Sequence, residues 1–154
     1  MEQSLSRDAH DRLSKELEAR TTSGRLEISH RIEEAREHGD IKENADYDAA
    51  KNEQGHNEAR IRQIEAILRD AVIVEQGNAE VVEPGVLVEL RHEGEDSTEI
   101  YLVGSIEERH DTYDVVSTSS PLGQALLGAG PGATVTYQGP RRELSVEVVS
   151  VRLA

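Results

Sequence analysis

The sequence contains no cysteine, so it has neither a disulfide framework nor a thiolate ligand for a metal ion. Phenylalanine and tryptophan are also absent, and tyrosine occurs only four times. We therefore expect neither aromatic stacking platforms for nucleic acid nor aromatic ligand pockets. No apolar run reaches the length of a membrane span, and the first residues lack the apolar segment of a signal peptide. These absences predict a soluble, cytoplasmic protein.

Basic residues are scarce as well. Lysine and arginine together number 17 against 31 aspartates and glutamates, which gives a net charge of −14. That sign opposes binding to nucleic acid by neutralisation of its phosphates. If the protein acts on nucleic acid, another protein or a metal ion must mediate the contact.

Proline and glycine are distributed unevenly, and their distribution divides the chain near residue 75. Before that point proline is absent, glycine is scarce, and apolar residues recur at helical spacing. After it, glycines and prolines separate short β-branched runs. The length of 154 residues suffices for two small domains. We predict one domain over residues 1–75 and a second over 76–154.

The first domain is predicted to be an antiparallel coiled-coil hairpin. On each side of an interruption, residues that are mostly apolar lie three or four positions apart and form one narrow seam, which turns polar or small in the middle. The seam positions are Leu13, Leu17, Thr21, Gly24, Ile28, Ile32 and Ala35, followed by Tyr47, Ala50, Gln54, Asn57, Ile61, Ile64 and Leu68. The connection is short, so the two helices must be antiparallel neighbours. The first helix, from about Asp8 to His38, would span roughly 45 Å, a shape suited to reaching into a partner.

The second domain is predicted to be a small α+β unit. Five segments have the composition of strands, and one short segment has that of a helix. The strands are expected at 85–90, 99–103, 113–116, 134–137 and 144–151, and the helix at 121–127. The fold class of the whole chain is therefore α+β, with a helical hairpin followed by a sheet that one helix covers.

The turn of the hairpin contains two carboxylates, those of Asp40 and Glu43. Gly39 suits the left-handed residue just past the first helix. Asp40 suits the N-cap of the second helix, and Glu43 three residues later would complete a capping box. The same pair suits a share in binding Mg²⁺, which often takes one or two protein carboxylates and completes its shell with water and phosphate. The residue pattern alone leaves both interpretations open.

Two segments of the sequence carry a family resemblance. The first runs from Ala35 to Tyr47 and continues along the second helix from Ala49 to Gly55; the other runs from Ser119 to Gly128. They resemble the hairpin-tip signature and the C-terminal signature of the GreA/GreB family of bacterial transcript cleavage factors. The match covers nearly the whole chain in the right order, and two distant motifs make it specific.

The resemblance implies an FKBP-like fold for the second domain and bacterial RNA polymerase as the partner. The loop of Ser120, Pro121 and Leu122 matches the segment with which the family docks at the rim of the polymerase secondary channel. The hairpin is then expected to enter this channel and approach the 3′ end of backtracked RNA.

The resemblance also implies a role for the turn. Asp40 and Glu43 match the family's acidic pair, which helps to hold a second Mg²⁺ and its water in the polymerase active site. Gly39, Asn44 and Tyr47 are expected to support this tip. The protein would then be an accessory factor and not itself an enzyme, a monomer that binds no Mg²⁺ tightly on its own, and it would stimulate cleavage of RNA by the polymerase.

Three other hypotheses about the function stay open. A Gre-fold modulator would enter the channel without stimulating cleavage, although such relatives usually alter the acidic tip. A prolyl isomerase would follow from the FKBP-like fold alone, although such pockets are built from aromatic residues. A coiled-coil adaptor would use Asp40 and Glu43 only as a cap.

Some positions depart from the family pattern. Leu26 replaces the usual proline, Ala133 replaces the usual aspartate, and the connection at 139–142 is short. The phenylalanines usual in the second domain are missing. These departures concern docking more than the chemistry of the tip.

Overall fold

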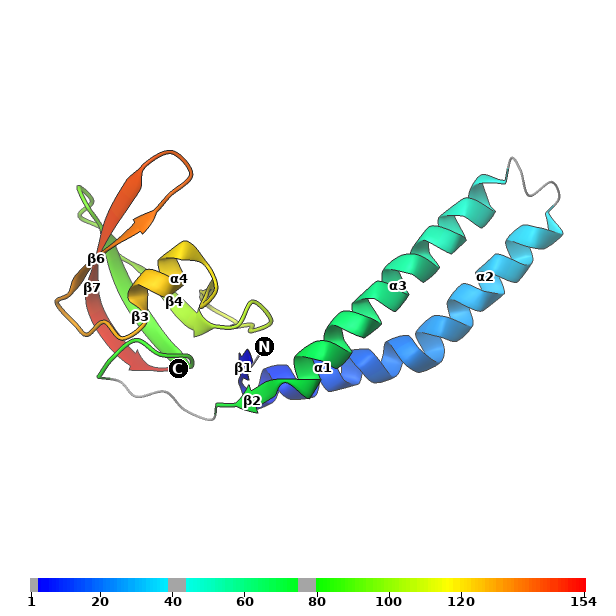
Figure 1. Cartoon of the computed structure of the whole chain (residues 1–154), viewed down its shortest axis with the longest axis horizontal. Coiled ribbons are helices and arrows are strands. Elements are labelled where there is room, and N and C mark those ends of the chain that lie inside the picture. Colours follow the sequence, from blue (N-terminus) through cyan, green and yellow to red (C-terminus); the bar gives the residue numbers. More distant parts are fainter. Residues whose placement is uncertain (1–2, 39–43, 75–79) are drawn as a thin grey trace. The chain divides into compact units, whose positions relative to one another are not determined.

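The computed structural model describes residues 3–38, 44–74 and 80–154 (Figure 1). The chain divides into two compact units. One unit is the hairpin, His10–Asp70, and the other combines the chain up to Ala9 with Ala71–Ala154. Among the described helices, none combines the length and the apolar character needed to cross a membrane.

The hairpin consists of a first limb in three parts and a second limb of one long helix (Figure 1). The first limb is made of α1 (Arg7–Ala19), a π-helical turn η1 (Arg20–Gly24) and α2 (Arg25–Glu37), and the second limb is α3 (Ala45–Arg69). The predicted pair of neighbouring helices is thereby confirmed. The first limb is not one uniform α-helix, however, because η1 interrupts it.

The predicted seam is the buried face of the hairpin. Ile28 and Ile32 of α2 pack with Ala50 of α3, and the half-buried Tyr47 packs against them. Further along α3, Asn57, Ile61 and Ile64 are buried. The seam is one residue wide, so side chains on the remaining faces of both helices stay in contact with solvent.

The second unit is built on a five-stranded mixed sheet in the order β5-β4-β3-β7-β6. The strands are β3 (Val86–His92), β4 (Glu99–Gly104), β5 (Asp114–Ser117), β6 (Thr134–Gln138) and β7 (Glu143–Leu153), and the helix is α4 (Pro121–Leu126). Only β4 and β5 pair in parallel; the other three pairs are antiparallel. All five predicted strands and the predicted helix are confirmed within a few residues.

The core of this unit is made of valine and leucine. Alternate residues of β3, namely Val86, Val88 and Leu90, point into it and are completely buried. Leu126 of α4 closes the same core from the helix side. The absence of phenylalanine is thus accommodated by β-branched residues, which suit a pleated surface.

The sequence analysis did not predict a short parallel pair that joins the two ends of the hairpin to the second unit. Strand β1 (Gln3–Leu5) pairs with β2 (Ala71–Ile73). Ser6 follows β1; its hydroxyl accepts a hydrogen bond from the amide of Ala9 at 3.1 Å and also contacts the buried carboxylate of Glu108. The amide of Ser6 donates to Glu108 Oε2 at 3.0 Å. These bonds explain why residues up to Ala9 belong to the second unit.

Candidate functional site

The end of the hairpin is defined by the residues on either side of its turn. Asp40 and Glu43, the predicted catalytic and metal-binding residues, lie outside the described residues, as does Gly39. On the near side, α2 ends with His38 at its C-cap, and on the far side α3 begins after Asn44.

Asn44 is the N-cap of α3, the position that one interpretation of the sequence gave to Asp40. The backbone amide of Tyr47 donates to Oδ1 of Asn44 at 3.1 Å, which is the bond that an N-cap side chain makes to the third residue of a helix. Because the helix starts at Ala45, a capping box formed by Asp40 and Glu43 would begin too early in the chain. Capping of α3 therefore does not account for the acidic pair.

The same asparagine also bonds to the other limb. Its Nδ2 donates to the carbonyl oxygen of Ala35, which also accepts from the amide of His38 at the C-cap of α2 at 3.3 Å. The Tyr47 ring packs against the seam and lies under the guanidinium of Arg36, with 5.9 Å between Cζ and the ring centroid. Asn44 and Tyr47 therefore tie α2 and α3 together directly below the turn.

The first turn of α3, next to the hairpin turn, is acidic. Asp46 and Asp48 lie in the first turn of α3, where the helix dipole favours negative charge. Carboxylate oxygens are the ligands that Mg²⁺ prefers. Within the described ranges, no group of three histidine, aspartate or glutamate side chains is arranged to hold a metal ion.

The predicted docking segment forms the start of α4. Ser120 is the N-cap: its hydroxyl accepts from the amide of Gly123 at 3.0 Å and donates to the carbonyl of Ser117 at 2.7 Å. Pro121 is the first residue of the helix and is exposed, whereas Leu122 is half-buried against the core. A Cβ atom on Gly123 would lie 1.9 Å from the Ser117 carbonyl, so only glycine permits this close turn.

An exposed apolar residue that the sequence analysis overlooked lies beside this segment. The parallel strands β4 and β5 end at the same edge of the sheet, and the amide of Thr118 donates to the carbonyl of Gly104 across that edge at 2.9 Å. Ile106 follows β4 there and is 69% exposed. It lines the same hollow as Ser117. A lone isoleucine in a polar loop after a strand was the signal in the sequence.

Comparison with known proteins gives a family match for each part of the chain. The model of the N-terminal domain of transcription elongation factors matches residues 3–73, and the model of the GreA/GreB C-terminal domain matches residues 76–153. The chain belongs to the GreA/GreB family of transcription elongation factors. The family resemblance of the two sequence motifs is thereby confirmed, and the GreA/GreB match extends over both units.

Individual GreA/GreB relatives match over most of their length. A protein of Saccharopolyspora erythraea called transcription elongation factor GreA is 46% identical over 138 residues, which are 88% of this chain and 85% of the relative. A protein of the same name from Roseiflexus is 39% identical over 96% of each chain. Among solved structures, GreA factor homolog 1 of Thermus thermophilus is 32% identical over 99% of each chain, with a TM-score of 0.46.

Proposed function

We propose that this elongation factor binds RNA polymerase at its secondary channel and stimulates the Mg²⁺-dependent cleavage of backtracked RNA by the polymerase. In this role it is an accessory factor that completes an active site belonging to its partner. The observation that carries the proposal is the position of the α3 N-cap. Asn44 caps the helix, so the acidic pair is not needed for that purpose, which supports a role for it in chemistry.

Asp40 and Glu43 would hold the ion together with groups of the polymerase. When bound, Mg²⁺ supplies Lewis-acid activation of the attacking water and stabilisation of charge on the reacting oxygens. The contribution of this chain is to bring two carboxylates to the right place. Asn44 and Tyr47 support them from below by joining the ends of α2 and α3.

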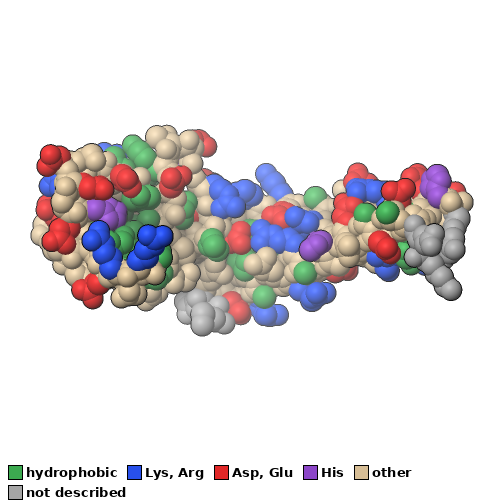
Figure 2. Space-filling model, turned by 90° about the horizontal axis from the view of Figure 1, so that it is seen from above, with side chains coloured by type: hydrophobic (Ala, Val, Ile, Leu, Met, Phe, Trp, Pro, Cys, Tyr) green, Lys and Arg blue, Asp and Glu red, His purple; other side chains and the backbone are tan. Residues whose placement is uncertain are grey.

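The charge of the protein agrees with this mode of action. On the face shown in Figure 2, acidic and basic side chains are interspersed along the hairpin, so this face is not a continuous basic track for RNA. With a net charge of −14, the protein would meet RNA through a protein partner and a metal ion. The surface proposed for docking on the polymerase is the start of α4, with Ser120, Pro121 and Leu122.

The proposal is tested with a stalled, backtracked polymerase complex that carries 3′-labelled RNA. The wild-type protein should release short labelled fragments in the presence of Mg²⁺, and the Asp40→Asn/Glu43→Gln variant should not. The Asp46→Asn/Asp48→Asn variant is the matched control: it makes the same change of charge in the first turn of α3 and should retain most of the activity. Circular dichroism checks that all three are equally helical.

Two outcomes would contradict the proposal. If the wild type binds the polymerase without releasing fragments, the protein is a modulator that enters the channel without stimulating cleavage. If both double variants lose activity equally, general acidity of the hairpin end, and not the acidic pair, is responsible.

A further inference from the structure

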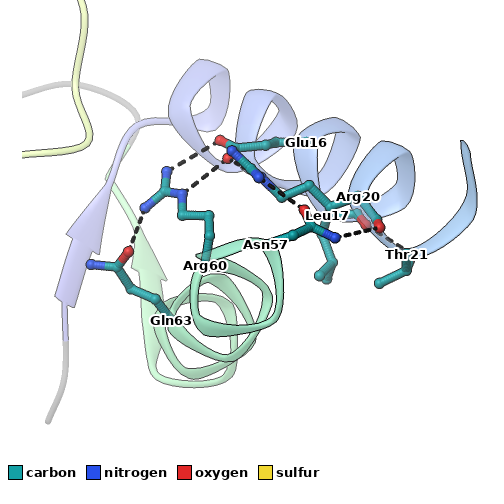
Figure 3. Close-up of polar contacts among 7 residues, drawn as sticks. All are labelled: Glu16, Leu17, Arg20, Thr21, Asn57, Arg60 and Gln63. Atoms are coloured by element: carbon teal, nitrogen blue, oxygen red, sulfur yellow. Dashed lines mark hydrogen bonds and ion pairs between the residues drawn. The ribbon is translucent and has the colours of Figure 1, made fainter. Parts of the chain in front are cut away.

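A cluster of polar side chains crosses the middle of the hairpin, far from the turn (Figure 3). Glu16 of α1 accepts from Nε of Arg20 at 2.7 Å, and it accepts from Nε and Nη2 of Arg60 of α3 at 2.9 and 3.1 Å. Arg60 also donates to Gln63 of its own helix at 2.8 Å. Bonds from Arg60 and Arg20 lower the pKa of Glu16 to about 2, so this carboxylate stays charged in acid that protonates an ordinary glutamate.

Asn57 is the centre of this cluster and is buried in the seam. Its side chain is 6% exposed and forms two hydrogen bonds with one residue of the opposite limb. Nδ2 donates to the carbonyl of Arg20 at 3.2 Å, and Oδ1 accepts from Nη1 of Arg20 at 2.9 Å. Buried amides need partners, so sliding α3 along the first limb would leave both groups of Asn57 without them.

Both bonds of Asn57 are made with Arg20, the first residue of the π-helical turn. The spacing of the seam gives a reason for this turn. Ile32 lies 19 residues after Leu13, and the seam positions between them make five steps. Five turns of an α-helix take about 18 residues. A single π-helical turn absorbs the extra residue: the amide of Arg25 donates to the carbonyl of Arg20, five residues earlier.

The sequence within the turn favours a bend of the first limb. Three successive hydroxyls donate back to carbonyls of the preceding turn, a pattern that bends helices. The bonds are Thr21 to Leu17 at 2.9 Å, Thr22 to Glu18 at 2.7 Å and Ser23 to Ala19 at 3.3 Å. Gly24 follows, where a Cβ atom would lie 3.1 Å from the Ala19 carbonyl. The first limb changes direction at this turn (Figure 1).

Outside this cluster, contacts between the limbs determine the register less strongly. The seam on either side is aliphatic, and aliphatic residues repeated every three or four positions pack in more than one register. The ion pairs nearer the turn, Arg25 with Glu58 and Arg31 with Glu53, are solvent-exposed and hence weak. A single buried polar residue is the device that fixes register in coiled coils.

We propose that Asn57 and Arg20, with the π-helical turn, lock the register of the hairpin and thereby set the position of its turn. The inference rests on the function proposed above: Asn57 and Arg20 are positioning residues for RNA cleavage. A slip of one helical turn displaces one limb by about 5.4 Å. A displacement of about 1 Å can already cost a hundredfold in rate when catalytic groups must meet a reacting atom.

The register is measured first, without polymerase. Because the chain has no cysteine, the exposed positions Leu26 in α2 and Glu65 in α3 can be changed to cysteine and labelled with nitroxides. Distances between the labels are then measured by pulsed electron paramagnetic resonance. The otherwise wild-type protein should give one narrow distribution. Asn57→Leu should give a second population displaced by about 5 Å.

Two further variants separate the register from general stability. Gln54→Leu makes the same polar-to-apolar change one turn away, where the glutamine accepts a bond from Lys51 of its own helix, and should keep the single distance. Asn57→Asp keeps the acceptor for Arg20 and should also retain the single distance. Asn57→Leu should melt no lower than the wild type, because leucine suits the seam, so loss of function cannot be assigned to unfolding.

Cleavage is measured next with the unlabelled variants. Asn57→Leu should lower the stimulation of cleavage at least tenfold without weakening polymerase binding, and Gln54→Leu should change it less than twofold. A single unchanged distance in Asn57→Leu would overturn the register lock. A shifted distance with wild-type cleavage would overturn the positioning role. If the wild type does not cleave at all, the proposed function fails, while the distance measurement still decides whether Asn57 sets the register.

Discussion

In the sheet domain, valines and leucines from β3, β4, β5, β7 and α4 meet in one core, whereas in the hairpin a seam one residue wide is interrupted by a buried asparagine. The first arrangement gains stability from apolar area removed from water. The second buries less and depends on directional bonds such as those between Asn57 and Arg20. The comparison indicates that burial of apolar area stabilises the sheet domain, whereas directional bonds fix how the two limbs of the hairpin are aligned.

The largest effect is expected from opening the core of the sheet domain. Leu126 is completely buried, so Leu126→Ala should lower the free energy of unfolding by about 2–5 kcal/mol. Thermal unfolding followed by circular dichroism measures this loss. Leu127→Ala at the neighbouring, exposed position is the control and should change stability little. Equal losses in the two variants would contradict a core centred on Leu126.

A smaller effect, confined to the docking segment, is expected from Gly123→Ala. The added methyl group would collide with the Ser117 carbonyl, and overpacking of this kind costs about 1–3 kcal/mol. Polymerase affinity should fall because Ser120 and Pro121 move, while the helicity of the hairpin is unchanged. Gly55→Ala, where a Cβ atom meets nothing within 4 Å, is the control and should bind normally. If Gly123→Ala binds the polymerase normally, the start of α4 is not part of the docking surface.

The pH dependence of the hairpin offers a third test. The bonds from Arg60 and Arg20 depress the pKa of Glu16 to about 2 from an ordinary value of 4.5. Because the folded-state pKa is the lower one, the stabilisation is present above pH 4.5 and is lost as the pH falls towards 2. For this partly exposed cluster we expect about 1–2 kcal/mol. The stability of Glu16→Gln should fall less steeply over that window than that of the wild type; parallel curves would contradict the assignment.

The smallest effect on stability is expected at the hairpin end. Asn44→Ala removes the N-cap of α3 and should cost about 1 kcal/mol. Asn44→Ser keeps a capping oxygen, so it should be nearly as stable as the wild type. It lacks, however, the amide that donates to the Ala35 carbonyl. If joining the limbs supports the acidic pair, both variants should stimulate RNA cleavage less than the wild type. Full activity of Asn44→Ser would limit Asn44 to capping.

The strands and helices were predictable from sequence because each is bounded by local signals. Glycines and prolines separate the β-branched runs of the sheet domain, and Ser120-Pro121 is a typical helix start. The pair β1 and β2 was not predictable, since each strand has three residues and their partners lie far apart in the chain. The parallel pairing depends on the whole hairpin being formed between them.

The details of the candidate site were less predictable for a related reason. Asp40 and Asn44 are both good N-cap residues, and each is followed by residues that suit a helix, so local pattern alone cannot choose between them. The structure selects Asn44 because its amide also reaches the Ala35 carbonyl of the other limb. Likewise, the spacing of the seam contained the extra residue, but the bond from Asn57 to the Arg20 carbonyl of the π-helical turn joins residues 37 positions apart and was not visible in it.

The pairing of β1 with β2 also bears on how such a protein can change. The hairpin is inserted between two strands that hydrogen-bond to each other, so the chain leaves and re-enters the second unit through the same small ladder. The pairing of β1 with β2 does not depend on how many residues separate the two strands in the chain. We therefore expect that whole turns can be added to or removed from both limbs of the hairpin together while the sheet domain keeps its own sequence.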